Sequence, residues 1–494
     1  MTEATATSTP RSAGSGTADT GYGSKSYRNY ILGILLTVYI FNFIDRTIIN
    51  ILTEPIKESF GVEDWQMGLL GGPAFAILYT FVGIPIARFS EKHHRVWIIA
   101  GSVFLWSLMT VLCGFATSFI ALFIFRIGVS IGEAGCSPPA NSLIADYFVP
   151  AERSTAVSVY ALGIPLGGMV AYVFGGYIVG NLDGPIIGAL LASWNWTWAV
   201  NALDWQNIEG WRVAFVIVGV PGLLVAAIVK LTIAEPPRGY TDPAEMQNRE
   251  QVGFREVLRI LSQKPAYWHV TMGVTIASFV NYGVGQFFVS FLIRTHELSI
   301  FDASVKIAMA LAVMAAIGTY MSGYLADKYA KRFPKALALI PMFALIGVIP
   351  MHVTGYLAES LWLAVPLMMV GQMLLYTYLC PLYAVPGGVV DSRMRATAVA
   401  VTLFIVNLLG YGLGPPLIGG LSTILNATFL SGLDPALTLE ACKASNLVAA
   451  AQSACDSANA DGLRWSMVLF KCLYLWAIFH FYMASRTIQR DMGR

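Results

Sequence analysis

Residues 87–95 read Ala-Arg-Phe-Ser-Glu-Lys-His-His-Arg, and a closely related pattern returns in the second half of the chain. Residues 323–332 read Gly-Tyr-Leu-Ala-Asp-Lys-Tyr-Ala-Lys-Arg, so a small residue, an acid, a base and a later base recur 236 residues further on. A second pair, Arg-Ser-Thr-Ala-Val-Ser-Val at 153–159 and Arg-Ala-Thr-Ala-Val-Ala-Val at 395–401, recurs at an offset of 242. Two matches at nearly one offset indicate a duplicated unit.

The amino-acid composition indicates whether this duplicated unit lies in water or in a lipid bilayer. The chain has 494 residues, of which 56% are hydrophobic and 12% charged, whereas soluble domains are about 45–50% apolar and about 25% charged. Most apolar residues fall in runs of about 20, the length that crosses a bilayer. The net charge of +2 provides no basic surplus for nucleic acid. The composition therefore predicts a polytopic membrane protein and argues against a soluble enzyme.

The hydropathy pattern predicts an all-α protein with six spans in each repeat. Lys and Arg gather in the tails and the even-numbered loops, so the positive-inside rule predicts that both termini are cytoplasmic. The twelve predicted spans are 30–52, 65–89, 96–116, 119–147, 154–180, 211–233, 266–293, 303–326, 335–356, 361–386, 396–425 and 465–484.

The spans divide the chain into five predicted parts. These are a disordered cytoplasmic tail at 1–28, a six-helix bundle at 29–233, a cytoplasmic linker at 234–265, a second six-helix bundle at 266–484 and a tail at 485–494. In the linker, apolar residues recur at helical spacing from Phe254 to Leu261 beside charged ones, which predicts an amphipathic helix on the membrane surface.

Two segments interrupt the pattern on the predicted outer side. Residues 181–210 contain four Trp, a density typical of a re-entrant or interfacial segment at headgroup level. Residues 427–464 read as an Ala-rich polar loop that holds Cys442 and Cys455. These two cysteines form a disulfide only if the loop faces an oxidising compartment, which the sequence leaves open.

The duplicated loops resemble the signature of the major facilitator superfamily, whose parallel six-span repeats hold the substrate site between them at mid-membrane. Asn42-Phe-Ile-Asp-Arg-Thr47, Val129-Ser-Ile-Gly-Glu-Ala134 and Ala145-Asp-Tyr-Phe148 are similar to the spinster family. The resemblance implies two pseudo-symmetric bundles and a lipid cargo such as a lysophospholipid or a sphingosine-1-phosphate-like molecule. The short loops favour a bacterial homologue in an inner membrane.

Charges inside the spans are functional candidates, because one at mid-bilayer costs about 2.5–3.5 kcal/mol on insertion scales. A rise of about 1.5 Å per residue places Asp45 and Arg126 at similar depth, with Glu133 nearer the cytoplasm. We expect Asp45 and Glu133 to exchange protons, since a carboxylate whose surroundings alternate changes its proton affinity. The alternative is a structural role, as an ion pair for Asp45 and a hydrogen-bonded neutral side chain for Glu133.

Arg46 and Arg126 keep their charge and suit a phosphate or carboxylate on the substrate, with Arg46 alternatively acting as a gate partner. Tyr282, Phe288 and Tyr376 are candidate lining residues for an apolar wall, although such aromatic residues also serve packing. The superfamily resemblance implies a cytoplasmic gate that locks the outward-open state; a solvated basic rim is the other interpretation. The gate candidates are Arg88, Glu91, Arg95, Asp146, Arg153, Asp327, Lys328, Arg332 and Arg395.

These features predict a proton-coupled secondary active transporter of an amphipathic lipid that works by alternating access. The alternatives are a major-facilitator transporter of a soluble organic anion or drug, and a non-transporting lipid sensor or scramblase. The sequence holds no HExxH, CxxC or Walker loop, so we expect neither an enzyme nor a metal site. The expected partners are the lipid substrate, protons and the bilayer; we expect no cofactor beyond the proton gradient, no nucleic acid and a monomer.

Overall fold

The computed structural model describes residues 21–202, 204–241, 252–330, 332–391, 394–444 and 447–493. In these residues the chain is built from helices, and twelve of the helical segments are long and apolar enough to cross a membrane. The predicted all-α polytopic fold is therefore confirmed. Residues 1–20 of the predicted tail and 242–251 of the predicted linker lie outside the described part.

The first bundle contains spans one to six. Its elements are α1 (Lys25–Ile51), α2 (Thr53–Phe60), α3 (Asp64–Gly71), α4 (Pro73–Ser90), α5 (Arg95–Gly114), α6 (Phe119–Ala134), α7 (Ser137–Tyr147), α8 (Pro150–Ala161), α9 (Gly163–Asn181), α10 (Gly184–Ser193), α11 (Thr197–Ala202), η1 (Trp205–Asn207) and α12 (Gly210–Thr232).

The second bundle contains spans seven to twelve and follows the short helix α14 (Phe254–Ser262). Its elements are α15 (Pro265–His296), η2 (Asp302–Ala308), α16 (Met309–Tyr329), α17 (Ala336–Leu357), α18 (Leu361–Leu375), η3 (Tyr376–Tyr378), α19 (Leu379–Gly388), α20 (Arg395–Ile405), η5 (Val406–Tyr411), α21 (Gly412–Leu433), η6 (Ala441–Lys443), α22 (Ala449–Cys472) and α23 (Tyr474–Asp491).

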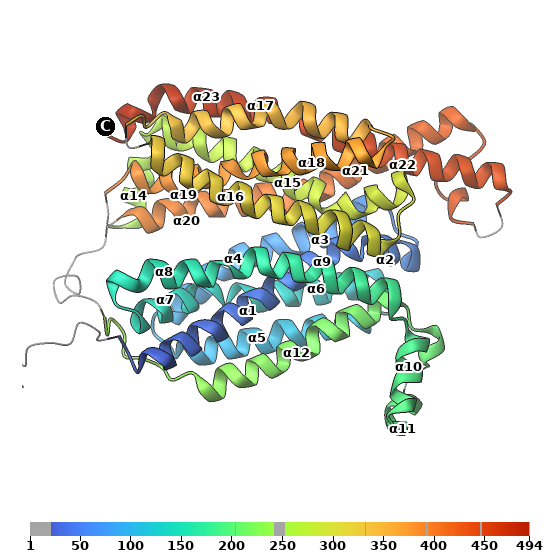
Figure 1. Cartoon of the computed structure of the whole chain (residues 1–494), viewed down its shortest axis with the longest axis horizontal. Helices are drawn as coiled ribbons and strands as arrows, with labels where there is room; N and C mark the ends of the chain where they lie inside the picture. Colours follow the sequence, from blue (N-terminus) through green and yellow to red (C-terminus); the bar gives the residue numbers. More distant parts are fainter. Residues whose placement is uncertain are drawn as a thin grey trace, which may run out of the picture.

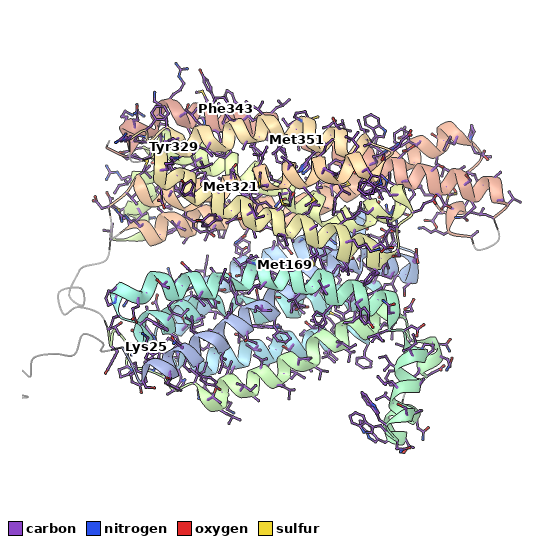
Figure 2. All side chains as sticks on the ribbon, viewed as in Figure 1. Lys25, Met169, Met321, Tyr329, Phe343 and Met351 are labelled. Carbon is purple, nitrogen blue, oxygen red and sulfur yellow. A yellow bond between two sulfur atoms is a disulfide. The ribbon has the colours of Figure 1, made fainter. Side chains whose placement is uncertain are left out.

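The two bundles form two layers whose spans run in a common direction (Figure 1). The start of α1 and the end of α23 lie at the same end of the molecule (Figure 1), which we call the terminal side; the other end is the opposite side. Figure 2 shows Lys25 and Tyr329 near the terminal side, one on each bundle. The predicted helix in the linker is α14, which buries Val257 and Leu261 while Phe254 stays exposed.

Gly and Pro divide several spans into shorter helices. The second span breaks at Gly72 before Pro73, and the fourth breaks after Gly135, just before the prolines that open α7. In the second bundle the eighth and eleventh spans contain the π-helical turns η2 and η5, a departure that is common at functional sites. Pro415 and Pro416, by contrast, lie inside the continuous helix α21.

The loop predicted at 427–464 is mostly helical, which corrects the sequence interpretation. Helix α21 continues to Leu433 and α22 begins at Ala449, because alanine favours helix even where the segment is polar. Cys442 and Cys455 form a disulfide that closes the connection between these helices. This hairpin projects from the opposite side along the direction of the spans (Figure 1).

The bundles meet closely on the opposite side, where α3 packs against α21. A Cβ atom on Gly68 would collide with the backbone of Pro415, and one on Gly419 would collide with the backbone of Asp64. Glycine is therefore required at both positions for the two backbones to approach this closely. This contact between α3 and α21 at Gly68 and Gly419, which we call the glycine seam, keeps the two bundles together at this end.

Candidate functional site

The charges predicted inside the spans form two ion pairs between α1 and α6. Asp45 Oδ1 lies 3.3 Å from Arg126 Nη1, as the similar depth of the two residues predicts. Thr110 on α5 donates a hydrogen bond of 2.8 Å to Asp45 Oδ2. Asp45 is 1% exposed and Arg126 is completely buried, so this pair is enclosed within the first bundle.

The second pair joins Arg46 to Glu133. Arg46 Nε donates to Glu133 Oε2 over 2.6 Å, and the Arg46 side chain keeps 19% of its surface exposed while Glu133 keeps none. The guanidinium lies 4.6 Å from the ring centroid of Phe75 and 4.5 Å from that of Tyr79, a cation–π arrangement that holds a charge away from bulk water. Asp45 and Arg46 are thus neighbours in sequence with separate partners.

Several buried polar atoms around these pairs have no hydrogen-bond partner among the described residues. They include Glu133 Oε1, Arg126 Nε and Nη2, and Asn42 Oδ1. A buried polar group without a partner costs about 1–3 kcal/mol, so unpaired atoms of this kind mark positions for a proton, a water molecule or a ligand group. Glu133 has one oxygen committed to Arg46 and one available.

Aromatic rings connect the Arg46 environment to the second bundle. The Phe75 ring lies 5.5 Å from the Tyr411 ring, and the Tyr411 ring lies 4.7 Å from that of Tyr282. Tyr282 is 40% exposed although it lies in the middle of α15. The rings therefore form a bridge from α1 and α4 to η5 and α15 at mid-span.

The remaining aromatic candidates differ in accessibility. Tyr376 is half-buried, and its hydroxyl accepts a hydrogen bond of 3.5 Å from Asn281 Nδ2. Phe288 is only 6% exposed and packs beside Phe291. In this conformation Arg46, Tyr282 and Tyr376 are accessible, whereas Arg126 and Phe288 are enclosed.

The predicted gate residues on the terminal side separate into two groups. Arg95 is buried and pairs with Asp146 and, over 2.6 Å, with Glu235; Arg153 donates to the Ala145 carbonyl over 2.9 Å. All of these contacts stay within the first bundle and its linker. Within the described residues, no ion pair joins the gate candidates of one bundle to those of the other. Exposed candidates are Arg88, Glu91, Asp327, Lys328, Arg332 and Arg395.

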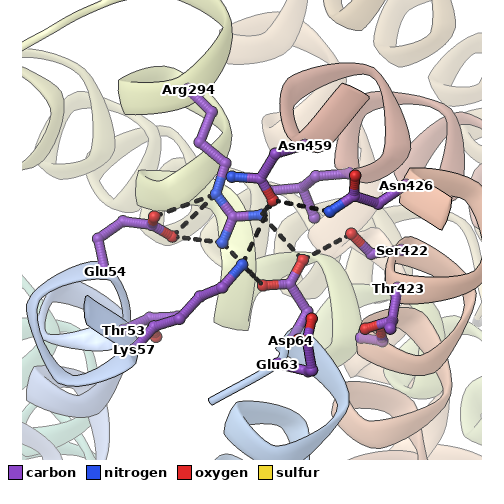
Figure 3. Close-up of polar contacts among 12 residues, drawn as sticks. Thr53, Glu54, Lys57, Glu63, Asp64, Arg294, Ser422, Thr423, Asn426 and Asn459 are labelled. Atoms are coloured by element: carbon purple, nitrogen blue, oxygen red, sulfur yellow. Dashed lines mark hydrogen bonds and ion pairs between the residues drawn. The ribbon is translucent and has the colours of Figure 1, made fainter. Parts of the chain in front are cut away.

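A cluster on the opposite side does connect the bundles, and the sequence interpretation missed it. We call it the opposite-side cluster; Figure 3 shows Arg294 at its centre. Arg294 Nη2 lies 2.7 Å from Glu54 Oε1 and 2.8 Å from Asp64 Oδ1, so one residue of the second bundle holds two carboxylates of the first. The members are Glu54, Lys57, Asp64, Arg294, Ser422 and Asn459.

Further contacts make the cluster a network. Lys57 Nζ lies 2.7 Å from Asp64 Oδ1, Ser422 donates to Asp64 Oδ2 over 2.7 Å, and Asn459 Oδ1 accepts from Arg294 over 3.1 Å. Bidentate, charge-assisted hydrogen bonds of this kind are among the strong ones. The opposite side is therefore closed by charge as well as by the glycine seam.

Residues 128–132 read Gly-Val-Ser-Ile-Gly, the spacing found around some nucleophilic serines. In this chain the segment lies inside α6, and Ser130 is buried with its hydroxyl donated to the Ile127 carbonyl over 2.8 Å. A Cβ on Gly132 would collide with Trp106. A strained strand-to-helix turn is required for a nucleophile at this spacing, so here the motif serves helix packing.

Two six-helix bundles around charged residues at mid-span define the architecture of a major-facilitator protein. The family model of the Major Facilitator Superfamily matches residues 35–415. A crystal structure of a bacterial homologue of the human lysosomal transporter spinster, in an inward-facing and unoccupied conformation, is 41% identical to this chain; the match covers 95% of this chain and 99% of that one, with a TM-score of 0.89.

Two further relatives agree with this placement. An MFS-type efflux pump of Mycolicibacterium smegmatis is 30% identical over 394 residues, or 80% of this chain and 84% of that protein. Protein spinster of Drosophila melanogaster is 27% identical over 423 residues, or 83% of this chain and 65% of that protein. The chain therefore belongs to the spinster family within the Major Facilitator Superfamily.

Proposed function

We propose that this chain is a proton-coupled secondary active transporter that moves an amphipathic lipid, such as a lysophospholipid or a sphingosine-1-phosphate-like molecule, by alternating access. The observation that carries the proposal is the Arg46–Glu133 pair, which combines a partly accessible cation with a buried carboxylate at mid-span. A proton on Glu133 removes the negative charge that holds Arg46, and the guanidinium then becomes available to an anionic headgroup. Proton binding and anion binding are thereby linked.

The apolar part of the substrate fits the aromatic bridge. Phe75, Tyr411 and Tyr282 lie between the Arg46 guanidinium and the second bundle. Phe75 is buried, whereas Tyr411 and Tyr282 are partly exposed. A molecule with an anionic head at Arg46 and a hydrocarbon chain beside the Tyr411 and Tyr282 rings satisfies both kinds of surface. A lipid cargo is what the resemblance of the Asn42–Thr47 and Val129–Ala134 motifs to the spinster family implies.

The closed end supports a state assignment for the alternating cycle. The opposite-side cluster joins the bundles, while the exposed terminal-side candidates have no such connection. With both termini in the cytoplasm, as the distribution of Lys and Arg predicts, this is the inward-facing state. The 41%-identical bacterial spinster homologue was likewise solved facing inward.

Transport into liposomes tests the proposal. Purified protein is reconstituted, a labelled lysolipid is added, and uptake is followed with and without an imposed pH gradient. We expect gradient-dependent uptake that Asp45→Asn and Glu133→Gln abolish, with Glu256→Gln on the exposed face of α14 as the matched control. Full uptake in both carboxylate variants would refute proton coupling at these residues.

The second candidate function is efflux of an amphipathic drug. The observation in its favour is the 30% identity to an efflux pump over most of both chains. In the same liposomes, a drug carrier exports a cationic or neutral dye under a pH gradient and ignores the lysolipid. Lipid movement that is independent of the gradient would instead identify a scramblase.

A further inference from the structure

The Trp-rich segment between the fifth and sixth spans forms a self-supporting arm. We call α10, α11 and η1 together the Trp arm. Asp183 accepts a hydrogen bond of 3.1 Å from the Ile186 amide and so caps α10. At its base the Gly184 amide donates to the Ile208 carbonyl over 2.9 Å. A Cβ on Gly184 or Gly188 would collide with Trp205, so η1 packs directly on α10.

The surface of this arm is apolar and exposed. Trp194, Trp196 and Trp198 are 56%, 49% and 74% exposed. Their rings follow one another, with centroids 5.9 Å and 6.3 Å apart. Ile186 and Leu190 on α10 are 47% and 40% exposed. Exposed apolar surface is unfavourable in water at about 25 cal/mol per Å², and a contiguous patch of this kind marks an interaction surface.

The position of the arm identifies the partner. The spans run in one direction in Figure 1, and α10 and α11 run across that direction, at the level where the spans end on the opposite side. The twelve spans fix the plane of the bilayer around them. The arm therefore extends sideways from the first bundle at the boundary between acyl chains and headgroups, where Trp is enriched in membrane proteins.

The geometry of the arm also distinguishes a re-entrant segment from an interfacial one, the two interpretations of residues 181–210. Helix α10 has 10 residues and is about 15 Å long, and it lies across the spans, which excludes a segment that enters the bilayer core and returns. From residue 184 to residue 203 the sequence has no ionisable side chain. An interfacial helix that binds anionic lipid carries Lys or Arg on its polar face, so this one has no electrostatic reason to select anionic headgroups.

We propose that the Trp arm is an interfacial anchor, which binds the headgroup–acyl boundary of the leaflet on the opposite side irrespective of headgroup charge. The arm joins α9 to α12, both of which belong to the first bundle. Helix α9 also contacts η2 and α16 of the second bundle. The anchor thus holds the first bundle relative to one leaflet through α9, one of the helices that contact the second bundle.

Spin-label depth measurements in liposomes test this proposal independently of transport. Cys380 and Cys472 are replaced by Ala, the disulfide is kept, and one label is attached at Trp198→Cys. Two reference labels are Phe104→Cys, on the exposed mid-span face of α5, and Ala436→Cys, in the exposed hairpin before η6. Accessibility to oxygen, which concentrates in the bilayer, and to a water-soluble nickel complex is measured for each label.

We expect the label at 198 to report a depth between the two references, equal in neutral liposomes and in liposomes with anionic lipid. A nickel accessibility equal to that at 436 would place the arm in water and overturn the proposal. Protection from both reagents would show that protein covers the arm, as a second copy of the chain would, and would overturn it as well. A depth equal to that at 104 would restore the re-entrant interpretation.

Discussion

At the scale of single residues, α1 presents two adjacent charges that are stabilised by different means. Asp45 is buried with Arg126 and Thr110, whereas Arg46 is shared between Glu133 and aromatic rings. The Asp45–Arg126 pair is enclosed by protein, whereas the Arg46–Glu133 pair is partly accessible from outside the protein through Arg46. We therefore infer that the Arg46–Glu133 pair contacts the substrate, and that the Asp45–Arg126 pair holds α1 against α6 while Asp45 keeps the proton-exchange role proposed above.

A double-mutant cycle tests this division of roles. Arg126→Ala leaves Asp45 buried without a counter-charge, and breaking such a pair costs about 3–5 kcal/mol. We expect Arg126→Ala to lower the thermal unfolding midpoint in detergent, and Asp45→Asn in the same chain to restore part of it. Equal midpoints for wild type and Arg126→Ala would show that the pair does not stabilise the bundle.

The double variant, Arg126→Ala with Asp45→Asn, also tests the expectation that Arg126 binds the substrate anion. Because Arg126 is enclosed here, we expect the double variant to retain lysolipid affinity in a binding assay, whereas Arg46→Gln loses at least tenfold. A loss of affinity in the double variant that matches the loss in Arg46→Gln would assign the anion to Arg126.

The pKa of Glu54 predicts how the stability of the opposite-side cluster depends on pH. Burial alone raises the pKa of Glu54, but Arg294 and Lys57 outweigh burial and lower the pKa below its ordinary value. A carboxylate with a lowered pKa stabilises the closed cluster at every pH above its ordinary pKa of about 4.3 and loses that contribution only as pH falls through the lowered value.

We therefore expect the opposite side to remain closed between pH 8 and pH 5. The distance between spin labels at Glu58→Cys and Leu433→Cys, which are exposed on α2 and at the end of α21, reports this. A distance that increases at pH 5 would show that the cluster itself responds to protons.

At the scale of elements, the sequence predicts apolar spans well because a run of about 20 apolar residues has few alternatives in a bilayer. All twelve spans and the linker helix α14 are present. The hairpin of α21 and α22 escaped prediction because its residues are polar and hydropathy cannot tell a polar helix from a loop. The opposite-side cluster escaped because its acids and its arginine are about 230–240 residues apart in sequence, and only the fold brings them together.

We expect the ion pairs of Arg294 on α15 to control how readily the two bundles separate on the opposite side. In Arg294→Gln both carboxylates of the first bundle lose their partner in α15, so we expect the distance between labels at 58 and 433 to increase. Arg464→Gln is the matched control, since Arg464 pairs with Asp461 inside α22. Equal distances in the two variants would show that the glycine seam alone closes this side.

At the scale of the whole molecule, the two bundles are in contact at one end and lack an ionic connection between the described gate residues at the other. In the proposed alternating-access cycle, rocking about the mid-span site separates the bundles on the opposite side and brings them together on the terminal side. The terminal-side candidates Glu91 and Arg332 are exposed now, and alternating access predicts that they approach when the opposite side opens.

We expect labels at Glu91→Cys and Arg332→Cys to move closer in the Arg294→Gln background than in the wild type. The physical reason is that rigid bundles cannot widen one end without closing the other. If the distance at the terminal side is unchanged while the opposite side widens, the bundles flex rather than rock.

The division of charge in the opposite-side cluster has a consequence for the opened molecule. When the bundles part, Glu54, Lys57 and Asp64 remain together with a net charge of −1, while Arg294 departs with +1. The separated bundles then carry opposite charges that attract each other across the opened side. Dissolved ions screen this attraction, with a screening length of about 8 Å at physiological ionic strength. The time that the molecule spends with its opposite side open should therefore lengthen at high salt concentration and shorten in dilute buffer.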